Sequence, residues 1–418
     1  MAEQTPAGLG FRSVPAEYRK RGYRHTASAV FCGTFTAVVA GQGPFVIRKL
    51  NGSAFQSLII DLGLAVPLIF AFLWGPFLRR RNPVRFTGLS FMAGGLLVLL
   101  SGLAQSLWAL ALVLAGGMLM TALSRPSMGV AFRQVYPDRW RGKLLSLPNA
   151  VDVLAQVVAL AVVGLMLERD LALHRCVFPA AGVALLVGGL LFRGIRGSRG
   201  DRTEDAAVGG RGVLAQAARS ARVALGNHGL LLFLLGYSVT TLGSVSAIKI
   251  LPLFASDCLD LTTRQYGYAL AAYQVAIVLS LYPWGVVMDR FGAPVTAVMS
   301  WLLQLGLFVA LFFVSTWPAF FVLVAARGLF QSGNNLAFYP IVMHFTRASE
   351  TQHGMALHFT IWGLRWTAIT FGLAWIVDAQ LFPMRWVFLG GAVMVLAGVA
   401  VMVAAWRRYG KAPVAEDA

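Results

Sequence analysis

The chain has 418 residues, of which 58% are hydrophobic and only 12% are charged, and its mean hydropathy is +0.70. Soluble globular proteins carry about 25% charged residues, so the composition excludes a soluble enzyme, a disordered chain and a collagen-like fibre. The apolar runs are also too long for the roughly ten-residue alternating strands of an outer-membrane barrel. One crossing of the hydrocarbon core takes about 20 helical residues, so the apolar fraction suffices for about twelve helices.

Apolar runs interrupted by proline, glycine and charge predict an all-α integral membrane protein with twelve transmembrane helices. In the first half the predicted spans begin near Thr26, Ser53, Phe86, Leu107, Leu144 and Cys176. In the second half they begin near Gly229, Gln265, Pro294, Pro318, Met355 and Arg385. We therefore expect an N-terminal segment (1–25), a six-helix bundle (26–193), a basic linker (194–228), a second six-helix bundle (229–406) and a tail (407–418).

Most of the 35 lysines and arginines lie between the predicted spans, on the side that also holds both termini. The positive-inside rule then predicts that both termini are cytoplasmic, and a bacterial cytoplasmic (inner) membrane is the default location. The run from Thr26 to Ile47 is too long for the apolar core of a signal peptide, so we expect this span to be retained.

The predicted linker is rich in arginine, and apolar residues recur in it at helical spacing: Val213, Leu214, Ala217, Ala221 and Leu225. This pattern predicts a short amphipathic helix on the anionic inner leaflet, with a solvated basic loop as the alternative. Under either interpretation, the position of the basic segments beside the cytoplasmic membrane surface explains the net charge of +18. We therefore expect membrane lipids, and not nucleic acid, as its partner.

The two halves resemble each other weakly, at an offset of about 210 residues. Residues 74–82 follow the second predicted span and residues 284–292 follow the eighth, each beginning with a Trp-Gly pair on the side of the termini. Residues 141–143 and 353–355 correspond in the same way at the start of the fifth and eleventh spans. Duplicated halves with a binding site at their interface near mid-membrane are the general construction of secondary transporters.

At residues 285–292 the sequence resembles the major facilitator superfamily, whose motif between the eighth and ninth spans is matched by Gly285, Asp289, Arg290 and Gly292. The resemblance implies a turn that helps to hold one gate closed. In physical terms, we expect Gly285 to allow close helix contact, Asp289 to cap or pair locally, and Gly292 to adopt a conformation that other residues resist. In the first half Arg79 and Asn82 replace the motif's aspartate and second glycine, which places the charge network of that turn in doubt.

Six ionisable side chains lie inside predicted spans, where each should face water or a partner: Asp61, Arg125, Asp152, Lys249, Arg327 and Arg365. Asp61 and Arg365 are at similar depth in spans that are neighbours across the halves in the resembled family. We therefore predict an ion pair between them that forms in one gate state, with separate polar pockets as the alternative. Arg125 and Asp152 also match in depth, which predicts a structural clamp within the first half. Lys249 is expected to extend towards the outer surface.

Arg327 is the leading candidate for substrate contact, because it falls near mid-membrane and Gln331 and Asn335 follow it. The stretch 327–333 also resembles an Arg-x-x-Gln-Gly motif that the family carries in its fourth span. Because the stretch lies in the tenth predicted span, the resemblance supports a role of Arg327 in proton coupling only weakly. Packing through Gly328 and Gly333 is the alternative. Further candidates for substrate binding are Thr36, Gln42, Tyr237, Thr241 and Trp362, although hydroxyl and amide groups also join helices inside membranes.

Within the spans, cationic side chains outnumber the two carboxylates, which favours an anionic or zwitterionic substrate or proton exchange through Asp61. The resemblance implies alternating access driven by a gradient, and the sequence contains no phosphate-binding loop for ATP. The alternative is a non-transporting sensor or assembly factor on the same scaffold.

No hydrolase or metalloprotease motif occurs, so we do not expect an enzyme. Three cysteines are too few and too far apart for a disulfide framework or a metal site, so we expect apolar packing residues: Cys32, Cys176 and Cys258. We expect no cofactor and a monomeric protein whose partners are a small-molecule substrate, protons and lipids.

Overall fold

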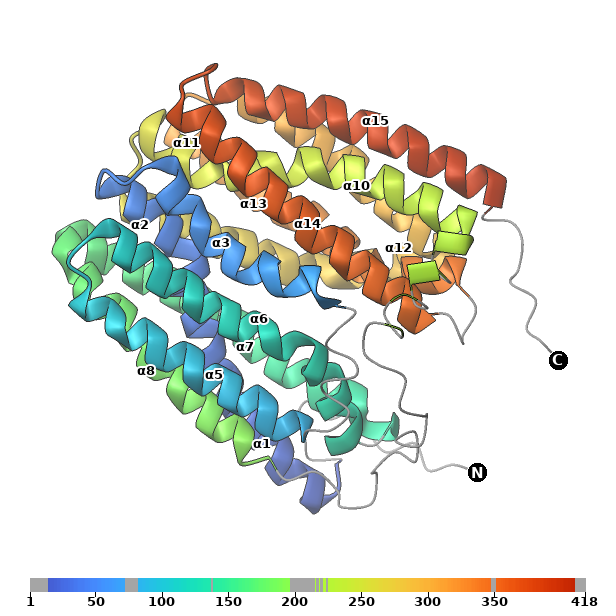
Figure 1. The fold of residues 1–418 in the computed structure, drawn as a ribbon, viewed down its shortest axis with the longest axis horizontal. Coiled ribbons are helices and arrows are strands. Elements are labelled where there is room, and N and C mark those ends of the chain that lie inside the picture. Colours follow the sequence, from blue (N-terminus) through green and yellow to red (C-terminus); the bar gives the residue numbers. More distant parts are fainter. Residues whose placement is uncertain are drawn as a thin grey trace.

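The computed structural model describes residues 14–71, 82–136, 138–195, 225–346 and 351–409, together with 215, 218, 221 and 222, and these residues are helical with short connections (Figure 1). Most of the predicted linker, including Val213, Leu214 and Ala217 of its predicted amphipathic helix, lies outside the described residues, as do Arg79 and residues 410–418 of the predicted tail. The first half contains α1 (Ala16–Thr36), the π-helix η2 (Ala37–Gln42), α2 (Gly43–Lys49), α3 (Ala54–Ile69), α5 (Pro83–Leu99), α6 (Leu107–Val135), α7 (Asp138–Arg169) and α8 (His174–Arg193). The second half contains α10 (His228–Lys249), α11 (Leu251–Asp257), α12 (Thr263–Phe312), α13 (Trp317–Phe345), α14 (Thr351–Asp378) and α15 (Arg385–Tyr409).

Helix starts are set by polar caps at the ends of the apolar runs. Ser53 accepts a hydrogen bond from the backbone of Gln56, whose side chain in turn accepts one from the Ser53 backbone. Thr262 and Gln265 form the same capping box at the start of α12. Each box satisfies backbone N–H groups that the first helical turn leaves without partners.

The 50-residue α12 is two helices joined at a sharp turn. Gly292 has φ 78° and ψ 167°, a non-helical conformation that interrupts the helix just before Pro294. A side chain would be strained at this φ, so glycine meets a backbone requirement here. The two parts of α12 correspond to the predicted spans that begin near Gln265 and Pro294.

Nine helical stretches of the described residues are long and apolar enough to cross a membrane. With α12 counted twice, and with the shorter α3 and the 29-residue α13 added, helices are present for all twelve predicted crossings. The prediction of an all-α membrane fold is confirmed.

The helices of each half pack together around an apolar core of their own. One core extends from Val14 to Ile195, and the other comes from α10–α15 with Phe45, Ala54 and Leu58 added from the first half. The start of α1 and the end of α15 lie at one face of the molecule, which we call the terminal face (Figure 1). We call the opposite face, which carries α2 and α11, the distal face.

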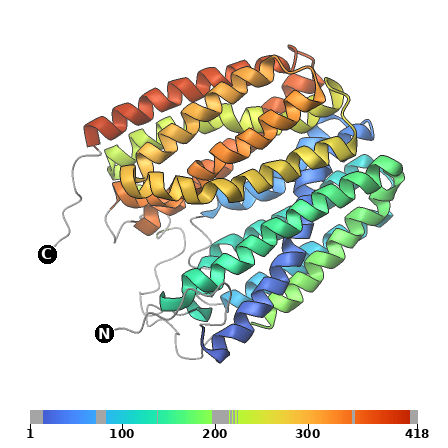
Figure 2. The same cartoon turned by 180° about the vertical axis from the view of Figure 1, so that it is seen from behind.

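The halves approach each other most closely towards the distal face. In Figures 1 and 2 the ribbons of the two halves meet around α2, α3 and α11 and diverge towards the terminal face. Hydrogen bonds between the halves join α2, α3 and the later part of α7 to α10, α11, α14 and the first part of α12. This arrangement places any shared polar site beneath a closed distal face.

Candidate functional site

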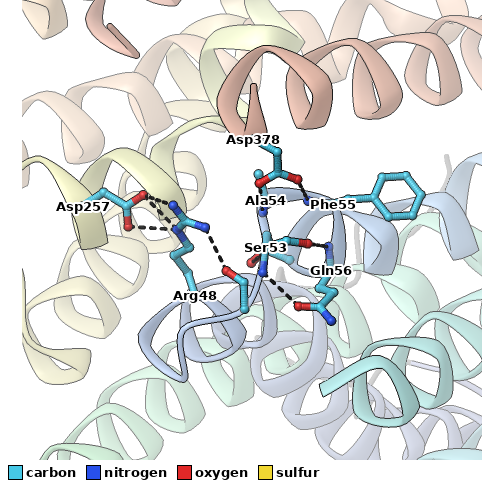
Figure 3. A network of polar contacts seen from close by, with 9 residues as sticks. Arg48, Ser53, Ala54, Phe55, Gln56, Asp257 and Asp378 are labelled. Carbon is cyan, nitrogen blue, oxygen red and sulfur yellow. Dashed lines mark hydrogen bonds and ion pairs between the residues drawn. The ribbon is translucent and has the colours of Figure 1, made fainter. Parts of the chain in front are cut away.

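Carboxylates of the second half hold the distal ends of the first half (Figure 3). Arg48 at the end of α2 donates to both oxygens of Asp257 at the end of α11, with its closest nitrogen 2.6 Å away. The carboxylate of Asp378, the last residue of α14, accepts hydrogen bonds from the backbone of Ala54 at 2.7 Å and Phe55 at 3.2 Å. Asp378 therefore caps α3 from the other half, where a helix N-terminus favours negative charge. Sequence patterns carry no signal for these contacts, because charges at span ends are common.

Small residues bring α7 and α12 into backbone contact just below this layer. A Cβ atom on Gly267 would lie 2.5 Å from the carbonyl oxygen of Leu160, and one on Gly164 would lie 2.9 Å from that of Thr263. The Thr263 hydroxyl donates to the Gly164 carbonyl at 3.0 Å. Such contacts leave no space for a solute between α7 and α12 at this depth.

Further into the membrane, Asp61 of α3 forms an ion pair with Lys249 of α10, at 2.9 Å between Nζ and Oδ2. Only 3% of the Lys249 side chain is exposed, against 21% for Asp61. The ammonium group also donates to the Thr370 hydroxyl at 2.9 Å and lies 4.7 Å from the centre of the Trp366 ring. The pair is thus a charged link between the halves, with partners from α14 on its second-half side.

The predicted Asp61–Arg365 pair is not formed in this state, because the Asp61 carboxylate pairs with Lys249. The expectation that Lys249 extends to the outer surface is wrong for the same reason. Depth along the spans correctly placed Asp61 at the interface, but it could not decide which of two cations in the second half would reach it. That choice depends on the rotation of α10 about its axis, which the nearly uniform apolarity of that helix leaves undetermined.

Arg365 is buried in the second half, and no carboxylate in the described part of the chain pairs with it. Its guanidinium lies 5.9 Å from the ring centre of Tyr237, and its Nε has no hydrogen-bond partner among the described residues. Tyr237 donates its hydroxyl to Asn334 at 3.0 Å and contacts His358, with 5.3 Å between ring centres. Trp362, one turn from Arg365 on α14, contacts Trp366 at 5.4 Å.

Arg327 on α13 is also buried and is held by an aromatic ring. It lies 4.5 Å from the ring centre of Tyr273 and donates to its hydroxyl at 3.4 Å. The next residue, Gly328, packs directly on the Tyr273 backbone, as the packing alternative expects. Gln331 donates to Asn335 at 3.0 Å, and its own Oε1 is unpartnered among the described residues. Substrate contact by these three side chains stays a prediction.

The predicted clamp between Arg125 and Asp152 is wrong in this structure. Asp152 accepts a hydrogen bond from Gln156 at 2.7 Å, and Gln156 accepts one from Gln274 of the second half at 2.5 Å. The carboxylate is therefore linked across the interface through two amides. Arg125 is exposed.

The remaining candidates from the first and seventh spans have local partners. Thr36 is exposed and donates to the carbonyl of Cys32, and the buried Thr241 donates to that of Tyr237. Gln42 is fully buried at the end of the π-helix η2, where its amide donates to the Leu160 carbonyl at 3.5 Å and its Oε1 lacks a partner in the described part of the chain. A π-helical turn inside a helix is often found at functional positions.

The turn at residues 285–292 partly matches its predicted roles. Gly292 has the positive φ that the motif requires, whereas Asp289 and Arg290 lie at the surface of the turn. The expected close helix contact at Gly285 is wrong, because a Cβ there would meet nothing within 4 Å. Asp289 makes no hydrogen bond or ion pair within the described residues. In the first half Asn82 caps α5 by accepting from the Arg85 backbone.

Comparison with known proteins gives a family match for the second half and a fold for the whole chain. Residues 233–417 match the family model for the Major Facilitator Superfamily. A solved structure of a mutant of the nucleoside transporter NupG has 12% identity and a TM-score of 0.71 over 93% of this chain and 100% of its own. A bacterial homolog of the human lysosomal transporter Spinster, inward-facing and unoccupied, has 13% identity and a TM-score of 0.69 over 94% and 98%. A D-xylose-proton symporter has 13% identity and a TM-score of 0.62 over 93% and 97%.

No curated protein matches the sequence. The fold of the whole chain is that of membrane transporters, and the family model covers the second half. The predicted resemblance to the major facilitator superfamily is confirmed for residues 233–417, and the protein is a multi-pass membrane protein with the fold of these transporters.

Proposed function

We propose that the protein is a secondary active transporter that moves a small solute by alternating access. The observation that carries the proposal is the Asp61–Lys249 ion pair, which joins the two halves inside the membrane. A charged pair at this depth is costly unless the groups meet water or a ligand in part of a working cycle. Rocking of one half against the other would separate the two residues and hydrate them, so the pair acts as a gate.

In this proposal the structure represents a state closed at the distal face. The Arg48–Asp257 pair, the Asp378 cap on α3 and the α7–α12 glycine contacts form the closed layers above the gate. At the terminal face the ribbons of the two halves diverge (Figures 1 and 2). Solute would therefore enter and leave at the terminal face in this state.

We propose proton coupling through Asp61. Neutralising this carboxylate removes the partner of a buried ammonium group, so arrival of a proton weakens the closed distal gate. A structural neighbour is described as a D-xylose-proton symporter, and this description supports the proposal. The basic segments favour a terminal face in the cytoplasm and a bacterial inner membrane as the location.

The test is solute-driven proton movement in proteoliposomes that contain a trapped pH-sensitive dye. Purified protein is screened for thermal stabilisation by carboxylates, nucleosides and sugars, and each solute that stabilises it is then applied as an inward gradient. We expect at least one such solute to change the internal pH, and Asp61→Asn to abolish the change. The matched control is Asp170→Asn, an exposed carboxylate that caps a short helix between α7 and α8. Solutes that bind without any solute or proton movement would indicate a sensor and contradict the proposal.

A further inference from the structure

No carboxylate of the described residues pairs with Arg365. The two carboxylates inside the spans are both engaged elsewhere, Asp61 by Lys249 at 2.9 Å and Asp152 by Gln156 at 2.7 Å. Arg365 is 8% exposed, makes no hydrogen bond to any described residue, and leaves its Nε buried and unpartnered. A buried guanidinium in this condition is stabilised when an anion reaches it.

The surroundings of Arg365 are aromatic. His358, on the same helix, lies 5.3 Å from Tyr237 and 4.3 Å from Phe338 between ring centres. Phe338 in turn lies 5.5 Å from Trp362. These four rings come from α10, α13 and α14, and together they form what we call the aromatic cluster: Tyr237, Phe338, His358 and Trp362. Such a set of rings favours a flat, aromatic partner.

A second buried group of the aromatic cluster also lacks a partner. His358 is 2% exposed, and its Nε2 makes no hydrogen bond within the described residues. A ring nitrogen and a guanidinium are both suited to the oxygen atoms of an acidic group. Buried polar atoms are nearly always paired in native structures, so these two groups beside one set of rings are available to bond an acidic ligand.

The position of Arg365 fits a transported solute. Trp366 contacts both Trp362 of the aromatic cluster and Lys249 of the gate pair, at 5.4 Å and 4.7 Å. Trp362 and Trp366 are both partly exposed. The cluster is thus next to the gate, on its terminal side, where solute entering from the terminal face would meet it.

Arg327 is a weaker candidate for the same role. It already donates to the Tyr273 hydroxyl at 3.4 Å, and its helix is held against α12 by the Gly328 contact. Arg365 has no comparable partner among the described residues, so an incoming anion displaces no existing hydrogen bond there.

We propose that Arg365 binds the acidic group of an aromatic organic anion whose ring lies against the aromatic cluster. The proposal rests on the proposed transport function and names its substrate class. An inorganic anion would satisfy the charge of Arg365 but would leave the rings without a role. Chloride is therefore included in the test as a rival.

The test measures binding of four probes to the purified full-length protein by calorimetry: 1-naphthoate, the neutral 1-naphthamide, propionate and chloride. We expect 1-naphthoate to bind at least about tenfold more tightly than each of the other three. Arg365→Met keeps the approximate length of the side chain and removes its charge, and should weaken 1-naphthoate binding about 100-fold, as loss of one partner of a buried charge pair does. Arg365→Lys should retain part of the affinity, and Arg408→Met, an exposed arginine at the end of α15, should bind as the parent does.

A role in folding is separated from a role in binding by the melting temperature without ligand. If the charge of Arg365 is unpaired until an anion binds, its removal should leave the melting temperature of ligand-free Arg365→Met equal to or above that of the parent. A clear fall would assign Arg365 to the fold and overturn the proposal. Equal binding of 1-naphthoate and 1-naphthamide, equal binding of chloride, or unchanged affinity in Arg365→Met would overturn it as well.

Failure of this inference is distinguishable from failure of the proposed function. If 1-naphthoate does not bind but another solute still drives proton movement in proteoliposomes, the substrate class is wrong and transport stands. If 1-naphthoate binds through Arg365 and no solute is ever moved, the site stands and the transport proposal fails.

Discussion

Replacing Asp61 by asparagine should open the distal face. In the closed state the variant leaves the Lys249 ammonium, only 3% exposed, without its carboxylate. Removing one partner of a buried ion pair costs about 3–5 kcal/mol. Because 21% of the Asp61 side chain is exposed and water already screens it, a reduced cost of about 2–3 kcal/mol applies. In the open state Lys249 is hydrated and the cost disappears, so the ratio of open to closed molecules should rise about 30- to 150-fold.

The assay is a distance distribution between spin labels on the two halves at the distal face. Leu103 (77% exposed) and Leu381 (50% exposed) suit labelling after replacement by cysteine in a cysteine-free background. We expect Asp61→Asn to move population from the short to the long distance. Lys249→Met should have a smaller effect, because the remaining carboxylate can reach water.

The double variant Asp61→Asn/Lys249→Met distinguishes a gate pair from a general loss of packing. With neither charge of the gate pair left, it should return towards the closed distribution of the parent, as replacement of both members of a buried pair often does. A double variant that is more open than Asp61→Asn, or an Asp61→Asn variant that is indistinguishable from the parent, would refute the reasoning.

Three further outcomes follow from the distal face. Gly267→Ala places a methyl group 2.5 Å from a carbonyl oxygen of α7 and should widen the label distance, whereas Gly285→Ala, with open space around it, should not. Arg48→Gln should weaken closure by only about 0.5–1 kcal/mol, because the Arg48 and Asp257 side chains are each 23% exposed. The distal face should therefore open less in this variant than in Asp61→Asn, and equal or greater opening would contradict the prediction. Partial burial and the nearby Asp257 carboxylate raise the pKa of the Cys258 thiol, so its reaction with a maleimide should accelerate at a higher pH than that of a free thiol. Asp257→Asn should shift the pH profile of this reaction to lower pH. Coincident profiles of the parent and the variant would contradict an effect of Asp257 on the thiol.

The helices were predictable because apolar runs and their polar ends are local properties of the chain. Ser53 and Thr262 cap helices at or close to predicted span starts, and Gly292 interrupts α12 where the motif predicts a turn. Depth was also predictable, since a rise of about 1.5 Å per residue places Asp61 and Arg365 well inside the membrane.

The partners of the buried charges could not be predicted, because they depend on rotation of helices about their own axes. Lys249 and Arg365 are both near Asp61 in depth, and only the packing of α10 against α14 directs the lysine to it. Asp152 similarly bonds Gln156, a residue one turn away, in place of the arginine at equal depth. The cap that Asp378 places on α3 joins residues 324 positions apart, and no local pattern reports it.

The most direct test of the account is the accessibility of Trp362→Cys, in a cysteine-free background, to a membrane-impermeant thiol reagent applied to either face of oriented vesicles. Trp362 is partly exposed and lies beside the gate. We predict reaction only from the terminal face in the otherwise unaltered protein, and from both faces once Asp61→Asn is added. Equal reaction from both faces without that substitution, or reaction from neither face, would contradict a gate formed by Asp61 and Lys249.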